Sequence, residues 1–105
     1  MKLTRIGGIS GMRAIRDLCH ATNTPTSCDD SWGGDIIAAA CVHVGSTFHP
    51  HLSRGAWISD PYQAEHYDDL HGPRIVNGTI AVPPGPGLGI TIPDGYFGSP
   101  IASYA

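Results

Sequence analysis

One pattern constrains the fold of this chain more than any other, and it occurs twice in the first half: a strand-like segment runs into a Gly-Gly pair and then into a helix-like segment. The first copy spans residues 1–6 and Gly7-Gly8, and the second spans residues 26–28 and, after a few polar positions, Gly33-Gly34. A glycine pair lets the chain turn between the two elements. Strands joined through helices lie parallel, with the helices packed on them. The pattern therefore predicts an α/β fold.

The first strand and the first helix can be placed from the spacing of apolar residues. Residues 1–6 alternate in polarity, which predicts a short strand. Ser10 is a suitable N-terminal cap for the helix, and Asn23-Thr24-Pro25 should end it, because proline cannot continue a helix. Between these points apolar side chains recur on one face and charged side chains occupy the other, as expected for a helix packed on a core.

The next elements repeat this order. Residues 26–28 predict a second strand, and Asp35 is expected to cap a second helix over residues 36–44. That helix is apolar on almost every side, so we expect most of it to be buried. Phe48 and its neighbours form the expected third strand. The order strand, helix, strand, helix, strand again indicates parallel strands.

The second half of the chain indicates turns and short extended pieces. A short helix is expected to open at Asp60-Pro61 and to run through residues 64–70. A hairpin is expected over residues 75–82, because Asn77-Gly78 is the strongest short turn signal. Glycine and proline are concentrated in residues 83–98, so this stretch cannot be helical. The Pro-Gly-Leu-Gly segment at residues 86–89 is expected to pack loosely.

The composition excludes several classes of function. The formal net charge is −3 and the six basic residues are scattered, so neither nucleic acid nor an anionic membrane surface is an expected partner. Three cysteines leave one unpaired in any disulfide scheme, and none is arranged as CxxC. No apolar run approaches the ~20 residues of a membrane span. These features favour a protein of the reducing cytoplasm.

Taken in order, these segments resemble the enolase superfamily, in its mandelate racemase and muconate lactonizing branch. Residues 2–8 resemble the sixth barrel strand, residues 29–35 resemble the end of strand seven, and residues 77–89 resemble the segment that leaves the barrel for the capping domain. Within the superfamily the chain is most similar to 4-hydroxyproline betaine 2-epimerases and cis-3-hydroxy-L-proline dehydratases. The resemblance implies about strands six to eight of a (β/α)7β TIM-like barrel, followed by a returning hairpin tail.

The resemblance also implies a division of the chain into two parts. Residues 1–70 would form a partial enolase-type barrel, and residues 71–105 would form a C-terminal tail that packs on a capping domain outside this sequence. The chain would then be a C-terminal fragment, inactive by itself, of a homo-oligomeric enzyme.

Three residues are expected to carry chemistry on this resemblance. Lys2, the only lysine, resembles the strand-six base that abstracts an α-proton, a role that requires the neutral amine. Asp29 or Asp30 lies where substrate contacts are made and would attract the cationic nitrogen of a proline betaine, although turn formation is the stronger alternative for Asp30. Trp57 offers an indole face to a quaternary ammonium group through cation–π attraction. Trp32 is open between such a contact and packing in the interior, and packing is favoured.

The cofactor that the resemblance implies is magnesium, held in the complete enzyme by carboxylates on strands three to five, which this sequence does not contain. The implied substrate is a small carboxylate of the proline betaine or hydroxyproline type, and the implied reaction is an epimerisation or a dehydration. The alternative is a stand-alone module without catalysis, in which His49, His51 and the Gly/Pro-rich tail bind a metal or a partner. Zinc sites usually show tighter ligand pairing, so no metal ligand is assigned in this chain.

Overall fold

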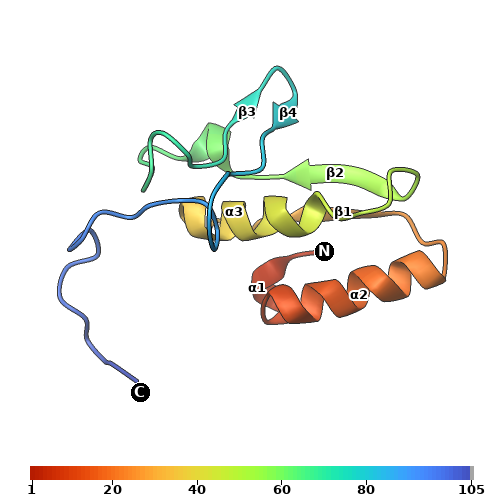
Figure 1. Ribbon diagram of the computed structural model, residues 1–105, viewed down its shortest axis with the longest axis horizontal. Coiled ribbons are helices and arrows are strands. Elements are labelled where there is room, and N and C mark those ends of the chain that lie inside the picture. The colour runs from red at the N-terminus through yellow and green to blue at the C-terminus, as the bar shows by residue number, and fades with distance from the viewer. Residues whose placement is uncertain (105) are drawn as a thin grey trace.

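The structure, a computed structural model, describes residues 1–104. A two-stranded parallel sheet and three helices form its larger part, and a separate β-hairpin projects from it (Figure 1). The helical elements are α1 (Leu3–Ile6), α2 (Ile9–Ala21), α3 (Gly34–Gly45) and the 3-10 helix η1 (Asp60–Tyr62). The strands are β1 (Thr26–Asp29), β2 (Ser53–Trp57), β3 (Ile75–Val76) and β4 (Thr79–Ile80). The predicted α/β class is confirmed.

The core has α3 at its centre. This helix packs on β1 and β2, and α1 and α2 pack on it in turn (Figure 1). In the interior, the thiol of Cys41 on α3 donates a hydrogen bond to the sulfur of Cys28 on β1 over 3.3 Å. This hydrogen bond and burial raise the pKa of the Cys41 thiol, so it behaves as a small core residue. The prediction that residues 36–44 are mostly buried is confirmed.

The sheet is parallel, and its register is defined where its strands end. Cys28 of β1 pairs with Ala56 of β2, and Asp29 pairs with Trp57. On the other side of β1, Lys2 forms a single parallel bridge with Asp29. Three neighbouring parallel segments are therefore present, although only two of them are full strands.

The prediction of a strand over residues 1–6 is wrong beyond Lys2. Lys2 itself is extended (φ −123°, ψ 123°), but Leu3–Ile6 then form the single helical turn α1. In a strand, Leu3 and Arg5 would share one face, and burying that face would bury a charge. Helical spacing instead places Leu3 and Ile6 together on the core and leaves Arg5 exposed.

The third strand lies later in the sequence than predicted. Phe48 is a buried core residue just after α3, and the chain turns before Ser53–Trp57 form β2. β2 contains Gly55 at φ +85° and lacks alternating apolar residues, so its own sequence gives no strand signal. Pairing with β1 stabilises it, because tertiary contacts override local propensity.

Both predicted helix caps are wrong. The residues in the N-cap position of α2 and α3 are Gly8 and Gly33, and neither helix has a side-chain cap hydrogen bond. Ser10 is exposed on the first turn of α2. Asp35 is fully buried in the first turn of α3, where it faces a loop rather than its own helix end.

The predicted hairpin is confirmed. β3 and β4 pair antiparallel, with Ile75 opposite Ile80, and the chain turns at Asn77-Gly78. Within residues 83–98 the chain forms turns and no helix, as predicted.

The tail is attached at defined points. Within residues 86–89 the expectation of loose packing is wrong at Leu88, which packs against the core. A hydrogen bond of 3.0 Å joins Nε2 of His43 on α3 to the carbonyl oxygen of Leu88. Further on, the ring of Tyr96 packs edge-on against Tyr67, with ring centres 5.1 Å apart. The division into residues 1–70 and 71–105 stays a prediction, and Ala105 lies outside the described residues.

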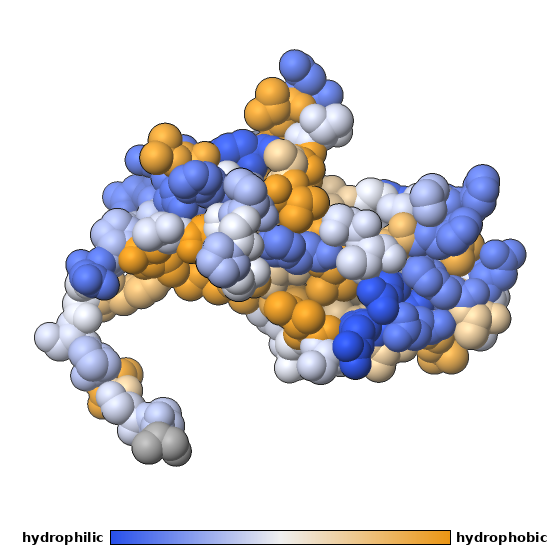
Figure 2. Space-filling model, viewed as in Figure 1, coloured by the Kyte–Doolittle hydropathy of each residue, from blue (hydrophilic) through white to orange (hydrophobic). Residues whose placement is uncertain are grey.

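The apolar side chains left exposed include several on the projecting parts of the molecule. Figure 2 shows apolar surface on the hairpin and on the C-terminal arm, where Val76 is 59% exposed and Ile101 is fully exposed. Among the helices of residues 1–104, none combines the length and apolar character needed to cross a membrane.

Replacing Gly34 by alanine should destabilise the fold by about 2 kcal/mol or more. Gly34 opens α3 at φ +62°, and a Cβ atom there would lie 2.6 Å from Cζ of Tyr67. The control is Gly78→Ala, because Gly78 has φ +75° but nothing within 4 Å of its Cβ position. Urea unfolding would measure both variants, and an equal loss in the two would contradict the steric argument.

Candidate active site

Lys2, Asp29 and Trp57 lie side by side across the three parallel segments. Asp29 is the central residue, because it pairs with Lys2 on one side and with Trp57 on the other. Residues paired in this way on parallel strands point to the same face of the sheet. The three residues predicted from the sequence are therefore brought together, and their chemical roles remain predictions.

The face that carries them is opposite α3. Cys28 precedes Asp29 in β1, and its side chain contacts Cys41 of α3. Because successive side chains of a strand point to opposite faces, Asp29 points away from α3, and so do its paired neighbours. The candidate site thus lies on the face of the sheet away from this helix, at the carboxyl ends of β1 and β2.

The amino group of Lys2 is held at the edge of this site by two contacts. Its Nζ donates a hydrogen bond of 3.0 Å to the carbonyl oxygen of Asp30, the residue that follows β1. The same nitrogen lies 5.7 Å from the ring centre of Trp57, within the range of a cation–π interaction. The side chain therefore reaches across the end of β1 toward β2.

Trp57 belongs to a group of three aromatic rings that we call the aromatic wall: Trp32, Trp57 and Tyr62. Ring centres are 5.7 Å apart for Trp32 and Trp57, 5.4 Å for Trp32 and Tyr62, and 6.3 Å for Trp57 and Tyr62. Trp32 is 63% exposed, so the prediction that it packs in the interior is wrong. Sequence reasoning favoured packing for Trp32 and missed Tyr62 as a member of the site. The available signal was their position just after the ends of β1 and β2.

The loop that follows β2 is held by Asp35 rather than by helical hydrogen bonds. The buried carboxyl group of Asp35 accepts hydrogen bonds from the backbone amides of Tyr67 (2.6 Å) and Asp68 (3.2 Å). It also contacts Nδ1 of His66 at 2.9 Å and the guanidinium of Arg74 at 3.3 Å. The helix predicted to open at Asp60-Pro61 is found only as the 3-10 helix η1. Its expected continuation over residues 64–70 is not helical, and the Asp35 carboxyl group accepts two of the amides there.

These contacts set the ionisation of Asp35. Burial favours the neutral acid, but the hydrogen bonds from His66, Asp68 and Tyr67 outweigh it and hold the pKa of Asp35 below its ordinary value of 3.8. Asp68 is stabilised in the same way: the amide of Thr91 donates to it over 2.7 Å, and this and its other hydrogen bonds lower its pKa to about 2. Both carboxyl groups are ionised at neutral pH, and they tie the loop and the tail to α3.

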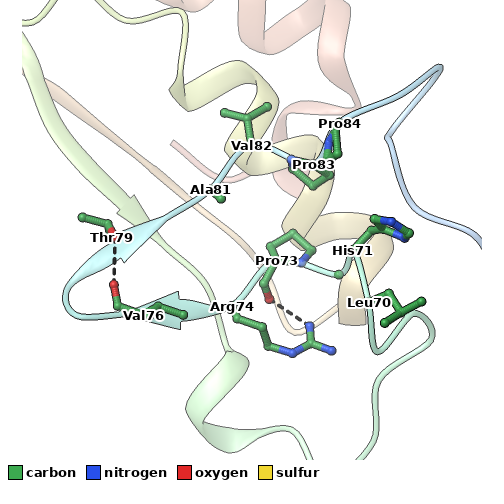
Figure 3. Close-up of a pocket in the computed structure, with 11 residues that line it drawn as sticks. Leu70, His71, Pro73, Arg74, Val76, Thr79, Ala81, Val82, Pro83 and Pro84 are labelled. Atoms are coloured by element: carbon green, nitrogen blue, oxygen red, sulfur yellow. Dashed lines mark hydrogen bonds between the residues drawn. The ribbon is translucent and has the colours of Figure 1, made fainter.

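A groove of about 360 Å³ lies at the base of the hairpin, and Lys2 is not among its lining residues (Figure 3). Its lining is mainly apolar and includes Pro73, Val82 and Pro83. The guanidinium of Arg74, which also lines the groove, is hydrogen-bonded to the carbonyl oxygen of Pro73 and to Asp35.

The histidines of the alternative interpretation lie at the other end of the sheet, where they line a hollow of about 410 Å³ with His20. The rings of His49 and His51 are 5.3 Å apart. Two of the ring nitrogens accept backbone hydrogen bonds: Nε2 of His20 from His49, and Nδ1 of His49 from His51. In the part of the chain that the structure describes, no three His, Cys, Asp or Glu side chains are grouped to hold a metal ion.

Comparison with known proteins assigns the chain to a family. The model of the enolase C-terminal domain-like family matches residues 1–95. The chain is 34% identical, over its whole length, to the cis-3-hydroxy-L-proline dehydratase of Roseibium aggregatum, and it spans 28% of the length of that relative.

Solved structures agree with this assignment. A mandelate racemase/muconate lactonizing enzyme from Roseovarius nubinhibens ISM matches 99% of this chain with a TM-score of 0.85 and 30% identity, and the match covers 28% of that enzyme. A member of the enolase superfamily from the same organism also has a TM-score of 0.85 and 26% identity. The match covers 93% of this chain and 27% of that protein's chain. The chain therefore belongs to the enolase C-terminal domain-like family of the enolase superfamily.

Proposed function

We propose that this chain supplies the carboxyl-terminal part, about strands six to eight, of the TIM-like barrel of a magnesium-dependent enzyme that removes the α-proton of a proline-derived carboxylate. In this proposal Lys2 is the base, and Asp29 and Trp57 contact the substrate. One observation carries it: in a chain of this superfamily, these three residues are neighbours in register on one face. In barrels of this type the chemistry gathers at the carboxyl ends of the strands.

The position of the Lys2 amino group suits a base. An amine can take a proton only in its neutral form, which keeps N–H groups as well as a lone pair. An N–H donated to the carbonyl oxygen of Asp30, as observed at 3.0 Å, would restrict the directions in which that lone pair can point. The proton taken from the substrate would then be held at Nζ, beside the Trp57 ring.

The neighbouring side chains suit a substrate that carries a cationic ring nitrogen. The carboxyl group of Asp29 would attract the nitrogen, and the indole face of Trp57 would stabilise it through cation–π attraction. The dehydratase of Roseibium aggregatum supports a hydroxyproline substrate and loss of water after proton abstraction. Epimerisation of a proline betaine would share the first step.

Magnesium is part of the proposal only at the level of the complete enzyme, where it would stabilise the negative charge produced by proton abstraction. The residues of this chain do not fit as its ligands: no suitable trio of ligand side chains is found in residues 1–104, and the carboxyl oxygens of Asp30 already accept protein hydrogen bonds. The resemblance implies that the ligands come from other strands. The complete enzyme would be a cytoplasmic homo-oligomer acting on a small molecule.

The test is complementation. The 105-residue chain alone should show no magnesium-dependent exchange of the α-proton of hydroxyproline or proline betaine. Mixed with the remaining N-terminal portion of the Roseibium aggregatum dehydratase, it should support exchange, measured by NMR as deuterium incorporation from heavy water. The N-terminal portion alone is the control. Exchange by the isolated chain, or no exchange by a mixture in which the two pieces associate, would contradict the proposal.

A further inference from the structure

We propose that Asp30 is a positioning residue that holds the aromatic wall of Trp32, Trp57 and Tyr62 in place beside Lys2. The use of that wall in substrate recognition rests on the proposed function, whereas the positioning itself does not. Asp30 is fully buried, and both of its carboxyl oxygens accept hydrogen bonds from segments that carry the wall. No substrate contact is needed from Asp30.

One oxygen of Asp30 sets the turn that presents Trp32. Oδ1 accepts a hydrogen bond of 3.2 Å from the backbone amide of Trp32, two residues further along the chain. This is the pattern by which an aspartate side chain forms a tight turn with its own backbone. Trp32 adopts φ +64°, a left-handed conformation that is costly for a bulky residue and needs such support.

The other oxygen of Asp30 holds the segment after β2. Oδ2 accepts hydrogen bonds from the amide of Ser59 at 2.7 Å and from its hydroxyl group at 3.0 Å. Ser59 precedes η1, and its carbonyl oxygen accepts the amide of Tyr62 over 2.8 Å. The Tyr62 ring is therefore placed through Ser59 by the same carboxyl group that places Trp32.

The strand backbone completes the arrangement. The amide of Asp30 donates to the carbonyl oxygen of Trp57 over 2.9 Å, and the carbonyl oxygen of Asp30 accepts the amino group of Lys2. One residue thus joins the candidate base and all three rings. A substrate lying against the wall would depend on Asp30 for the geometry of the surface that it contacts.

Replacing Asp30 by asparagine separates the two contacts of the carboxyl group, the one with the Trp32 amide and the one with Ser59. Asn has nearly the same shape but only one acceptor oxygen. Because Ser59 offers two donors and the Trp32 amide only one, that oxygen should stay with Ser59, and the NH2 group then faces the Trp32 amide, so the Trp32 turn is lost. The chain contains two tryptophans, and both are in the wall. Indoles 5.7 Å apart with ring planes at 68° are close enough for their electronic transitions to couple, which gives a paired band in far-ultraviolet circular dichroism.

The experiment is circular dichroism of the full chain and its variants. Wild type should show this paired tryptophan band, the couplet. Trp32→Phe should lose the couplet and so define the baseline. Asp30→Asn should fall to that baseline, while the helical signal stays. Ser59→Ala, which removes only the hydroxyl donor, should give a smaller loss. Asp69→Asn, a change at an exposed aspartate, is the matched control and should keep the couplet.

A second readout in the complemented enzyme separates this inference from the proposed function. If exchange is observed, Asp30→Asn should raise KM by about tenfold with a smaller effect on kcat, because the wall acts in binding. A couplet that survives Asp30→Asn, or is absent from the wild type, overturns the positioning role. Should exchange fail while the couplet behaves as expected, the positioning role stands and the proposed function is contradicted.

Discussion

Replacing Lys2 by alanine in the complemented enzyme should abolish α-proton exchange on one face of the substrate, a loss of about 10²- to 10⁴-fold. Lys2 is the only lysine of the chain, and its Nζ lies at the carboxyl end of β1 beside Asp29 and Trp57. No other basic side chain of these segments takes its place, because Arg5 is exposed on α1. The measurement is deuterium incorporation, followed separately for each enantiomer or epimer of the substrate.

The matched control for this prediction is Arg5→Ala. It removes a positive charge three positions away, from a side chain that faces solvent, so exchange should stay near the wild-type rate. The bridge between Lys2 and Asp29 is a backbone contact, and the alanine variant retains it. Unchanged exchange after Lys2→Ala, with the two pieces still associated, would remove Lys2 from the role of base.

Elements with strong local signals could be predicted from the sequence. The apolar helix over residues 36–44 and the turn at Asn77-Gly78 are found where expected, because each is specified by neighbouring residues. The segment after Lys2 and the strand β2 could not be placed, since burial of Leu3 and pairing with β1 decide them. Both depend on contacts between residues far apart in the sequence, which a local pattern does not contain.

The candidate site shows the same limit. Asp29 and Trp57 could be named because the resemblance fixes their positions relative to Lys2, and they are paired in the sheet. Trp32 and Tyr62 could not be named as site residues, because their rings are brought together by hydrogen bonds to the two carboxyl oxygens of Asp30. Turn formation by Asp30, the stronger alternative in the sequence, is what the structure shows.

Asp35 was predicted to cap α3, but it binds the loop after β2 instead, and these contacts lead to a second prediction with a large effect, on stability. Replacing Asp35 by alanine should destabilise the chain by about 3 to 5 kcal/mol, the cost of removing one partner from a buried charged network. The side chain is fully buried, and its loss would leave the amides of Tyr67 and Asp68 without this acceptor and would remove the nearer carboxylate partner of Arg74. Because small domains are stable by only about 5 to 15 kcal/mol, urea unfolding should begin at much lower denaturant.

The pH dependence distinguishes this explanation from a simple packing defect. The pKa of Asp35 is lower in the folded chain than its ordinary value of 3.8, so its contribution is complete above that pH and is lost as the pH falls through the folded value. The gap in stability between wild type and Asp35→Ala should therefore be full near neutral pH and narrow below 3.8. Asp69→Asn is the control, because Asp69 is exposed, and it should leave stability nearly unchanged. A gap that is equal at neutral and acid pH would mean that lost volume, and not the carboxylate network, causes the destabilisation.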